Sequence, residues 1–280
     1  MREKINTINM VKIISWNING VRSKSMDLFH KNNFNMESNL GKMMIEENPD
    51  IICFGETKCQ DENIKQFKWP EKDNNLLYPF MAWNCSKEKK GYSGVGILSK
   101  QDFKNLGSIP TLEEDLEGRS LVLEFNDFYL IDVYTPNSGT KGEYRKIWDI
   151  KIADYLKSLQ KSKKPIIYCG DLNVAAKEID IHNKTVWKNE KNPGVYDYEK
   201  KGFNHILSCG YIDVWRHYNP TRTEKYTWWD VRSRSRNKNK GWRIDYFLMR
   251  ENDIKYIKRV DILDHIFGSD HCPILLELNI

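Results

Sequence analysis

Acidic, amide and imidazole side chains recur in this sequence at the points where apolar stretches begin or end. These side chains are Asn17, Asn19, Glu56, Asp171, Asn173, Asp270 and His271. Carboxylate and amide oxygens are hard donors that suit Mg²⁺. A carboxylate beside an amide donor and an imidazole can also activate water and stabilise a phosphate. In combination, these groups predict metal-dependent hydrolysis of a phosphodiester.

Each motif alone also has a purely structural interpretation. The Asn-Gly pair that starts at Asn19 is ordinary turn chemistry, and Asp171 fits an Asx turn. A lone Glu56 fits a surface position at a strand end. His271 and its acidic neighbour point in opposite directions if the segment is extended. The catalytic interpretation therefore depends on the combination.

Asp245 is different because it lies inside the apolar run Arg243–Met249. We expect its carboxylate to be at least half buried, and a buried carboxylate needs a partner. Orientation of an imidazole is one way in which a buried Asp obtains such a partner.

A basic stretch near the C-terminal third of the chain is bordered by aromatic residues. Between Arg222 and Arg243 there are eight Lys and Arg residues against two acidic ones, and Trp228 and Trp242 lie at its borders. Core packing is an alternative explanation for each tryptophan. Basic residues interleaved with aromatic ones are also typical of a nucleic-acid-binding surface.

The composition sets limits on the class of protein. The 280 residues are 40% hydrophobic and 30% charged, with a net charge of +5. No stretch approaches the roughly 20 apolar residues of a membrane span, and Met1–Met10 lack the apolar run of a signal peptide. None of the six cysteines forms a C-x-x-C pair, which excludes zinc ribbons and thioredoxin-type sites. We expect a soluble, intracellular protein in a reducing compartment, either cytoplasm or nucleus, with no membrane partner.

Short strand-like runs must position the polar groups, and helical patterns are interspersed with them. The predicted strands are Val11–Ile18, Asp50–Phe54, Gly94–Leu98, Ser120–Phe125, Phe128–Tyr134, Pro165–Cys169, Arg243–Met249 and Ile274–Ile280. The apolar period predicts a helix over Tyr144–Leu159 and a weaker one over Met36–Asn48. Because no linker interrupts the pattern, we expect one α/β (α+β) domain over residues 11–280, after a short N-terminal extension at 1–10.

Nucleotide-binding loops are excluded by the glycine pattern. The glycines of Gly91–Gly96 have the wrong spacing for a dinucleotide loop, and no Walker lysine motif is present. We therefore expect no nucleotide cofactor.

The order of the motifs resembles the exonuclease III family of abasic-site endonucleases, within the endonuclease/exonuclease/phosphatase superfamily. The matching blocks are WNING (16–20), ETK (56–58), GYSGVGILSK (91–100), YTPN (134–137), GDLNVA (170–175), GWRIDYFL (241–248) and GSDHCP (268–273). The resemblance extends from about Val11 to Ile280. It implies a four-layer sandwich of two packed β-sheets flanked by helices, as in deoxyribonuclease I.

The resemblance also implies roles for individual residues. Glu56 would be the principal Mg²⁺ ligand, and Mn²⁺ would substitute for Mg²⁺. The residues implied near the metal are Glu56, Asn17, Asn19, Asp270, Asp171, Asn173 and His271.

The catalytic groups implied by the resemblance surround the phosphate. Asp171 would orient or deprotonate the attacking water, and Asn173 would hold that water and the phosphate. His271, oriented by Asp245, would stabilise the phosphate in the transition state. Tyr134 and Asn137 would donate hydrogen bonds to it.

The implied partner is double-stranded DNA that contains abasic sites, bound by a monomer. Trp228 and Trp242 match the positions of a pocket for the extruded sugar. Residues that match positions near backbone phosphates are Arg22, Lys58, Tyr92, Arg119 and Arg145.

The sequence departs from the family pattern in three places. Asn19 stands where some relatives have Asp, so the metal site carries one negative charge fewer. The segment 21–48 is longer than in the family, and its part Met26–Glu37 is expected to be polar and loop-like. Thr140 and Arg232 stand where some relatives insert side chains into DNA.

The activity implied is Mg²⁺-dependent cleavage on the 5′ side of an abasic site in base excision repair, with a 3′-hydroxyl left behind. A 3′–5′ exonuclease or 3′-phosphodiesterase activity is expected to accompany it. Two alternatives stay open: another enzyme of the superfamily, such as a nicking endonuclease or a phosphoinositide phosphatase, and a non-enzymatic DNA-binding relative. The second is disfavoured because Glu56, Asp171, Asp245 and His271 are all retained.

Overall fold

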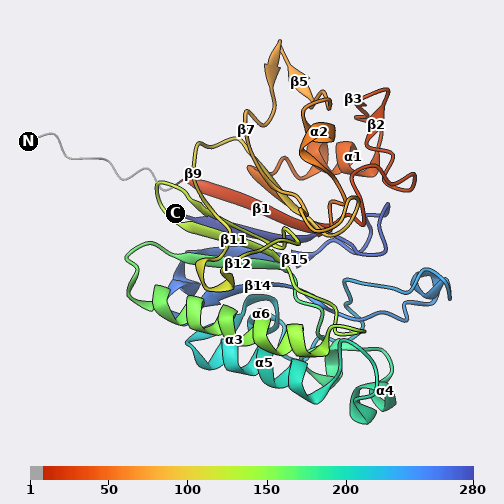
Figure 1. The fold of residues 1–280 in the computed structure, drawn as a ribbon, viewed down its shortest axis with the longest axis vertical. Coiled ribbons are helices and arrows are strands. Elements are labelled where there is room, and N and C mark those ends of the chain that lie inside the picture. Colours follow the sequence, from red (N-terminus) through yellow and green to blue (C-terminus); the bar gives the residue numbers. More distant parts are fainter. Residues whose placement is uncertain (1–8) are drawn as a thin grey trace, which may run out of the picture.

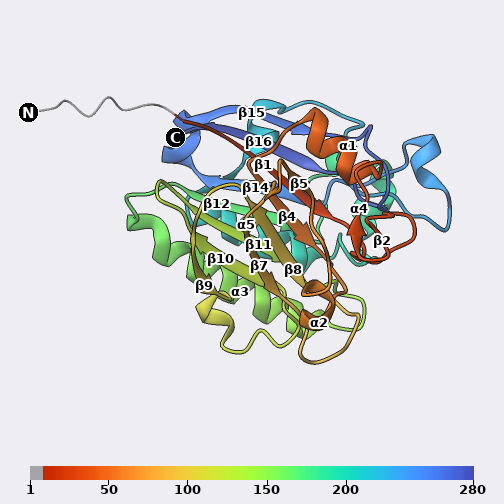
Figure 2. The same cartoon turned by 90° about the horizontal axis from the view of Figure 1, so that it is seen from above.

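Two six-stranded β-sheets packed face to face organise the chain in the computed structural model, which describes residues 9–280 (Figures 1 and 2). Most of the extension predicted at 1–10 lies outside the described residues. Helices cover the outer face of each sheet, so that the order of layers is helix, sheet, sheet, helix (Figure 1). The predicted four-layer sandwich is confirmed. Among residues 9–280, no helix is both long enough and apolar enough to cross a membrane.

The first sheet brings the ends of two parallel strands together. Its strand order is β15 (Ile257–Ile262), β16 (Ile274–Asn279), β1 (Met10–Asn17), β4 (Ile51–Gly55), β8 (Val95–Ser99) and β7 (Phe80–Asn84). β1 runs parallel to β4, with Asn17 opposite Gly55. The residues that follow these two strands, including Asn19 and Glu56, therefore emerge at the same edge of the sheet.

The second sheet aligns three polar side chains in one row. Its strand order is β13 (Tyr211–Asp213), β14 (Asp245–Arg250), β12 (Ile166–Asp171), β11 (Tyr129–Tyr134), β10 (Ser120–Glu124) and β9 (Lys104–Gly107). Asp171 pairs with Tyr134 on the parallel strand β11 and with Asp245 on the antiparallel strand β14. The register thus fixes these three residues side by side at one end of the sheet.

Helices and short elements complete the layers. α3 (Gly142–Ser158) and α5 (Asp197–Ser208) lie side by side over the second sheet, and α1 (Asn39–Glu46) packs on the first (Figure 1). The remaining helices are α2 (Asp61–Ile64), α4 (Lys184–Asn189) and α6 (Val214–Tyr218), with 3₁₀ turns at Pro110–Leu112, Leu159–Lys161, Glu178–Asp180, Ser235–Lys238 and Glu251–Tyr256. Two hairpins are formed by β2 (Phe29–His30) with β3 (Asn33–Phe34), and by β5 (Glu71–Lys72) with β6 (Asn75–Leu76).

The apolar alternation along each strand explains why the layers form. Ile13 faces the core between the sheets, whereas its neighbour Ile14 faces the cluster under α1. In the second sheet, Ile167 faces the core between the sheets and Tyr168 packs against Trp148 of α3. Because strands in both sheets are buried on both faces, their sequences read as nearly continuous apolar runs.

All eight predicted strands are present with ends within two residues of the prediction, and both predicted helices are present as α3 and α1. Besides the short strands of the two hairpins, four strands of the large sheets were not predicted: β7, β9, β13 and β15. These four are the edge strands of the two sheets. An edge strand is covered less completely than a central one, and so it carries a weaker apolar signal in the sequence.

The expectation of a polar, loop-like segment at Met26–Glu37 is wrong in part. Met26 and Leu28 are fully buried in the cluster under the first sheet. Phe29 and Phe34 pack on Trp69, with ring centroids 5.2 and 6.0 Å away. Scattered apolar residues at irregular spacing gave no periodic signal, which is why the sequence did not predict this packing.

A buried ion network fastens the loop after β12 to the start of β14. Arg243 donates to both oxygens of Asp180 at 2.8 and 2.9 Å and to Asp213 at 2.6 and 3.1 Å. Arg216 also donates to Asp180, which is completely buried. Although burial favours the neutral acid, Arg243 and then Arg216 hold the pKa of Asp180 below its ordinary value. The network stabilises the segment that carries Trp242 and Ile244.

We predict that Asp180→Asn destabilises the protein by about 3 to 5 kcal/mol at pH 7, because it leaves Arg243 and Arg216 buried without their charge partner. A lowered folded-state pKa contributes stability that is present above the unfolded value of about 3.9 and is lost as pH falls through the folded value. Urea unfolding should therefore show that the difference in the free energy of unfolding between the wild type and Asp180→Asn shrinks as the pH falls below about 4. An unchanged difference at low pH would contradict this account of the network.

Candidate active site

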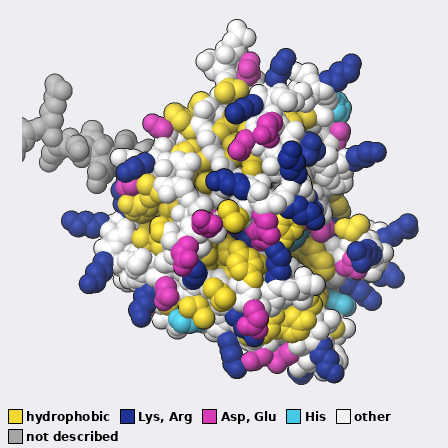
Figure 3. All heavy atoms as spheres, in the orientation of Figure 1, with side chains coloured by type: hydrophobic (Ala, Val, Ile, Leu, Met, Phe, Trp, Pro, Cys, Tyr) yellow, Lys and Arg dark blue, Asp and Glu magenta, His cyan; other side chains and the backbone are white. Residues whose placement is uncertain are grey.

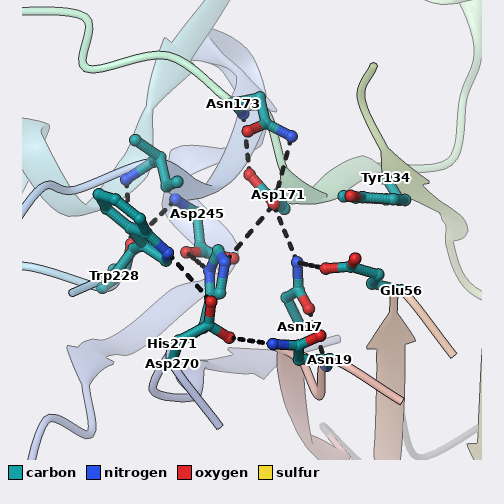
Figure 4. Close-up of polar contacts among 12 residues, drawn as sticks. Asn17, Asn19, Glu56, Tyr134, Asp171, Asn173, Trp228, Asp245, Asp270 and His271 are labelled. Atoms are coloured by element: carbon teal, nitrogen blue, oxygen red, sulfur yellow. Dashed lines mark hydrogen bonds and ion pairs between the residues drawn. The ribbon is translucent and has the colours of Figure 1, made fainter. Parts of the chain in front are cut away.

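The predicted site residues converge at one end of the sandwich, where β1, β4 and β12 end (Figure 4). They surround a cavity of about 180 Å³. Its lining comprises Glu56, Tyr134, Asn137, Asp171, Asn173, Pro193, Gly194, Trp228, Trp242, Ile244, Asp270 and His271. Pro193, Gly194 and Ile244 were not among the predicted site residues. Proline and glycine in a loop give no signal that distinguishes a pocket wall from an ordinary turn.

Oxygen atoms that could coordinate a metal gather on the side of the site that the first sheet provides. Asn17 donates from its amide nitrogen to Glu56 at 3.2 Å, and Asn19 donates to Asp270 at 3.0 Å. The ammonium of Lys58 lies 3.0 Å from Glu56 Oε1 and donates to Asn19 Oδ1. These two oxygens therefore already converge on a cation.

The donor set on this side fits a hard divalent cation. Glu56 and Asp270 provide carboxylate oxygens, and Asn17 and Asn19 provide amide oxygens, which are the ligand types that Mg²⁺ prefers. The ammonium of Lys58 contacts both Glu56 Oε1 and Asn19 Oδ1. A bound metal ion would replace the ammonium as the positive charge beside these two oxygens. These four residues could hold a metal. A second group of three residues also brings ligand atoms within 4.8 Å of one another: Asp171, Asp245 and His271.

A hydrogen bond from Asn17 links the two sheets at the centre of the site. The side-chain nitrogen of Asn17, at the end of β1, donates to Asp171 Oδ2 at 3.0 Å (Figure 4). The same nitrogen donates to Glu56, so a single amide links the carboxylates of the two sheets. Both Asn17 and Asp171 are only 2% exposed.

His271 lies between two buried carboxylates. Its Nδ1 is 2.8 Å from Asp245 Oδ2, and its Nε2 is 3.8 Å from Asp171 Oδ2. Although burial opposes the charged form, Asp245 and then Asp171 raise the pKa of His271 to about 10. The imidazole is therefore a cation at neutral pH, and the contact between Asp245 and an imidazole predicted from the sequence is present.

Asp171 has the environment of a base that works near neutral pH. Burial raises the pKa of Asp171 to about 7, against the opposing influence of His271. Its second oxygen accepts the backbone N–H of Asn173 at 2.8 Å. At neutral pH, a carboxylate with such a pKa is ionised in about half of the molecules, and in that form it can accept a proton from water.

Amide and phenol groups complete the rim around Asp171. Asn137 donates to the side-chain oxygen of Asn173 at 3.2 Å, and Asn173 donates to the carbonyl of Thr135 at 2.8 Å. Burial raises the pKa of Tyr134 well above its usual value, and Glu56 adds to this effect. Tyr134 therefore keeps its hydroxyl proton and can act as a hydrogen-bond donor.

The backbone of the site adopts conformations that are unusual for residues with side chains. Asn19, Glu56, Lys58 and Asn173 have φ angles of 49°, 53°, 49° and 49°. Such left-handed residues cluster at functional sites, where surrounding contacts hold them in place. Gly170 has a φ of 130°, and a Cβ there would lie 1.9 Å from the carbonyl oxygen of Val133. Glycine is thus required directly before Asp171.

Two tryptophans form the apolar wall of the cavity. Trp228 and Trp242 meet edge to face with ring centroids 5.7 Å apart, and both are partly exposed. The indole N–H of Trp228 donates to Asp270 at 3.2 Å, which ties this wall to the metal side. A Cβ at Gly194 would lie 2.8 Å from the Trp242 ring, so the loop approaches the ring closely.

The predicted phosphate contacts divide into two groups. Arg22 is exposed, and Lys58 and Tyr92 are partly exposed, so they are accessible to a ligand. Arg119 and Arg145 are 2% and 1% exposed, so their direct contact with DNA stays a prediction that surface access does not support.

Both buried arginines position other site residues. Arg145 is paired with Asp149 at 2.9 Å and donates to the carbonyls of Pro136, Leu172 and Asn173. Arg119 pairs with Glu117 and donates to the carbonyl of Tyr134 and the hydroxyl of Tyr92. Sequence matching located these residues near the site but could not tell a surface cation from a buried one.

The basic stretch at residues 232–240 contains both exposed cations and one arginine that is engaged within the protein. Arg232, Arg234, Lys238 and Lys240 are exposed. Arg236 instead donates to the carbonyls of Asp264, Ile266 and Ser269, and its guanidinium lies 4.4 Å from the centroid of the Trp229 ring. Arg236 therefore holds the loop in place.

A two-sheet sandwich with hard oxygen donors, a buried carboxylate and an imidazolium at its strand ends defines a class of phosphodiester-hydrolysing enzymes. Comparison with known proteins agrees with this class. The chain belongs to the Endonuclease/Exonuclease/phosphatase family, which it matches over residues 14–271.

Within this family, the chain is similar to nucleases that act on DNA and to the solved structure of one such enzyme. The chain is 38% identical to an exodeoxyribonuclease of Bacillus subtilis over 96% of this chain and 100% of the relative. It is 37% identical to a DNA-(apurinic or apyrimidinic site) endonuclease of Dictyostelium discoideum, over 97% of this chain and 72% of the relative. The structure of an AP endonuclease from Leishmania major superposes with a TM-score of 0.80 at 24% identity, covering 97% of this chain and 88% of the other. The last comparison shows the shared fold.

We predict that Trp242→Ala impairs cleavage of abasic DNA more than it impairs folding. A fully buried Trp costs about 3 to 5 kcal/mol on truncation to Ala, and a partly exposed wall residue should cost less. Incision per folded molecule and the free energy of unfolding should be measured on the same preparation. Trp148→Ala, at a fully buried position on the inner face of α3, provides the matched control. Full activity in a strongly destabilised Trp242→Ala protein would identify Trp242 as a core residue.

Proposed function

We propose that the protein is an Mg²⁺-dependent abasic-site endonuclease of base excision repair. It hydrolyses the phosphodiester 5′ to the lesion and leaves a 3′-hydroxyl. The observation that carries the proposal is the junction of three groups in one cavity: the oxygen donors around Glu56, the Asp245–His271–Asp171 row and the tryptophan wall. The similarity to two relatives supports the proposal: one is named an exodeoxyribonuclease, and the other is named a DNA-(apurinic or apyrimidinic site) endonuclease.

Glu56, Asp270, Asn17 and Asn19 would hold the metal, and Mn²⁺ would substitute for Mg²⁺. Bound Mg²⁺ would neutralise negative charge on the phosphate during hydrolysis. The amides of Asn17 and Asn19 add oxygen donors without adding charge, so affinity for the cation in the absence of DNA should be low.

The protein groups supply the base and the electrostatic stabilisation. Asp171 accepts the proton of the attacking water, which Asn173 helps to hold beside it. The cationic His271 stabilises the charge that develops on the phosphate, and Asp245 fixes the ring. Tyr134 and Asn137 donate hydrogen bonds to phosphate oxygens. Since these donors are already oriented by the fold, little reorganisation is needed at the moment of reaction.

The tryptophan wall accounts for the preference for abasic sites. A sugar without its base has no pairing or stacking to lose when it leaves the helix. Trp228, Trp242 and Ile244 offer that sugar an apolar surface next to the carboxylates. The cavity of about 180 Å³ is small, which disfavours a sugar that still carries its base.

The proposal includes a 3′–5′ exonuclease or 3′-phosphodiesterase activity, because a 3′ end presents the same phosphodiester to the same groups. We further propose that residues 11–280 form a single catalytic domain, that the protein acts as a monomer, and that it works inside the cell on double-stranded DNA.

One assay tests the proposal and separates it from its alternatives. A labelled duplex with a single tetrahydrofuran abasic analogue is compared with the intact duplex, with Mg²⁺ and with a chelator. We expect incision only beside the analogue and only with Mg²⁺. Equal nicking of both duplexes would indicate a general nicking endonuclease, and release of phosphate from phosphoinositides alone would indicate the phosphatase alternative.

We predict that Asp171→Asn lowers the single-turnover rate by at least about two to three orders of magnitude, since an amide cannot accept the proton of water. Binding of the abasic duplex should persist. Asp127→Asn, an exposed change at the turn before β11, serves as the control. A rate near that of the wild type would remove Asp171 from the mechanism.

We also predict that Asn19→Asp tightens Mg²⁺ binding to the DNA-free protein by about tenfold, because a second carboxylate would then lie beside Asp270. In the wild type, the amide of Asn19 instead donates to Asp270 at 3.0 Å. Calorimetric titration with Mg²⁺ alone measures the change, with the exposed Asn126→Asp as control. Equal affinities for the wild type and Asn19→Asp would place Asn19 away from the metal.

A further inference from the structure

The segment at residues 21–35, which we term the basic hairpin, starts directly beside the candidate metal site. The backbone N–H of Val21 donates to the carbonyl of Thr57 at 2.9 Å, within the segment that carries Glu56 and Lys58. Met26 is fully buried, and its sulfur would lie 3.1 Å from a Cβ at Gly268, two residues before Asp270. The basic hairpin is thus anchored to both loops that provide metal donors.

The tip of the basic hairpin has a defined conformation. β2 and β3 pair through His30 and Asn33, and the two residues between them, Lys31 and Asn32, have φ angles of 49° and 66°. Positive φ at both central residues is the pattern of a type I′ turn, in which Asn-Gly is usual and Lys is not. A lysine in this position is a local cost, and it places an exposed ammonium at the tip.

An aromatic cluster underneath gives the basic hairpin a rigid base. The rings of Phe29 and Phe67 stack with centroids 4.1 Å apart, and Trp69 meets Phe29 edge to face at 5.2 Å. The paired strands and these contacts hold the position of the tip relative to the metal site. Such a preformed surface loses little conformational freedom on binding.

The charges of the basic hairpin are available to an anion. A hollow of about 300 Å³ is lined by Arg22, Lys24 and Lys31 together with Phe29 and Phe67. Asp27, the acidic residue in this lining, already accepts from Asn35 at 3.0 Å and lies 2.9 Å from a ring nitrogen of His30. Within residues 9–280, no ion pair within 4.0 Å joins the three cations to a carboxylate.

The basic hairpin also faces the same way as other basic elements. β2 and β3 lie on the side of the molecule where the loop at 230–240 and α4 project (Figure 1). In the same orientation, Lys and Arg side chains extend along this side (Figure 3). Site residues adjoin both elements along the chain, since Asn19 precedes the basic hairpin and Trp228 and Trp242 border that loop.

We propose that Lys24 and Lys31 of the basic hairpin bind backbone phosphates of the duplex that flanks the cleaved bond. The inference rests on the proposed function and adds a contact that the resemblance to the family does not supply, because the segment is longer here. Lysines on a flexible stem bind phosphate as point charges and read no sequence. The basic hairpin would therefore increase affinity for damaged and intact duplexes alike.

The test is the salt dependence of binding by Lys24→Gln/Lys31→Gln. Fluorescence anisotropy with a labelled duplex that carries a tetrahydrofuran site is measured in chelator over a series of salt concentrations, so that no incision occurs. Loss of two phosphate contacts should reduce the slope of log K against log salt by about 1 to 2. The same reduction is expected on the intact duplex.

The matched control is Lys161→Gln/Lys163→Gln, which removes two exposed cations before the start of β12, at the opposite end of the strand from Asp171. Its slope should equal that of the wild type, and melting temperatures should show that both variants fold. Equal slopes for the hairpin variant and the control would overturn the proposal. Because these are binding measurements, a reduced slope without abasic incision by the wild type would contradict only the proposed function.

Discussion

The hydrogen bond from Asn17 to Asp171 is the contact on which the site depends. It crosses from the end of β1 in one sheet to the end of β12 in the other, at 3.0 Å and away from solvent. The first sheet supplies the donors around Glu56, and the second supplies Asp171 and Asp245. Each half is set by strand register within its own sheet, but only contact between the sheets makes them one site.

This arrangement keeps several charges buried close together, which would be costly without compensation. The positively charged imidazole of His271 provides this compensation, because it lies between the carboxylates of Asp245 and Asp171. Asn17 provides a neutral bridge between Glu56 and Asp171 where a charged residue would add repulsion or neutralise the metal donors. Further out, Arg145 binds three carbonyls of the surrounding loops and so fixes the backbone around Asn173.

The sequence predicted what depends on local pattern. Central strands buried on both faces carry strong apolar runs, and polar residues such as Glu56 and Asp171 were correctly placed at the ends of these runs. Edge strands such as β9 carry little apolar signal and were missed. Burial of Arg119 and Arg145, and the packing of Met26, depend on distant segments that meet only in the folded chain, which a linear pattern does not contain.

The claim that the two halves act as one centre is tested most directly by a double-mutant cycle between Glu56→Gln and Asp171→Asn. Single-turnover incision of a duplex with one abasic analogue is measured for the wild type, both single variants and the double variant. Residues that act as a unit show strongly non-additive effects. We predict that the double variant is about as slow as the slower single variant. Effects that multiply in full would show that the two carboxylates work independently and would contradict the account.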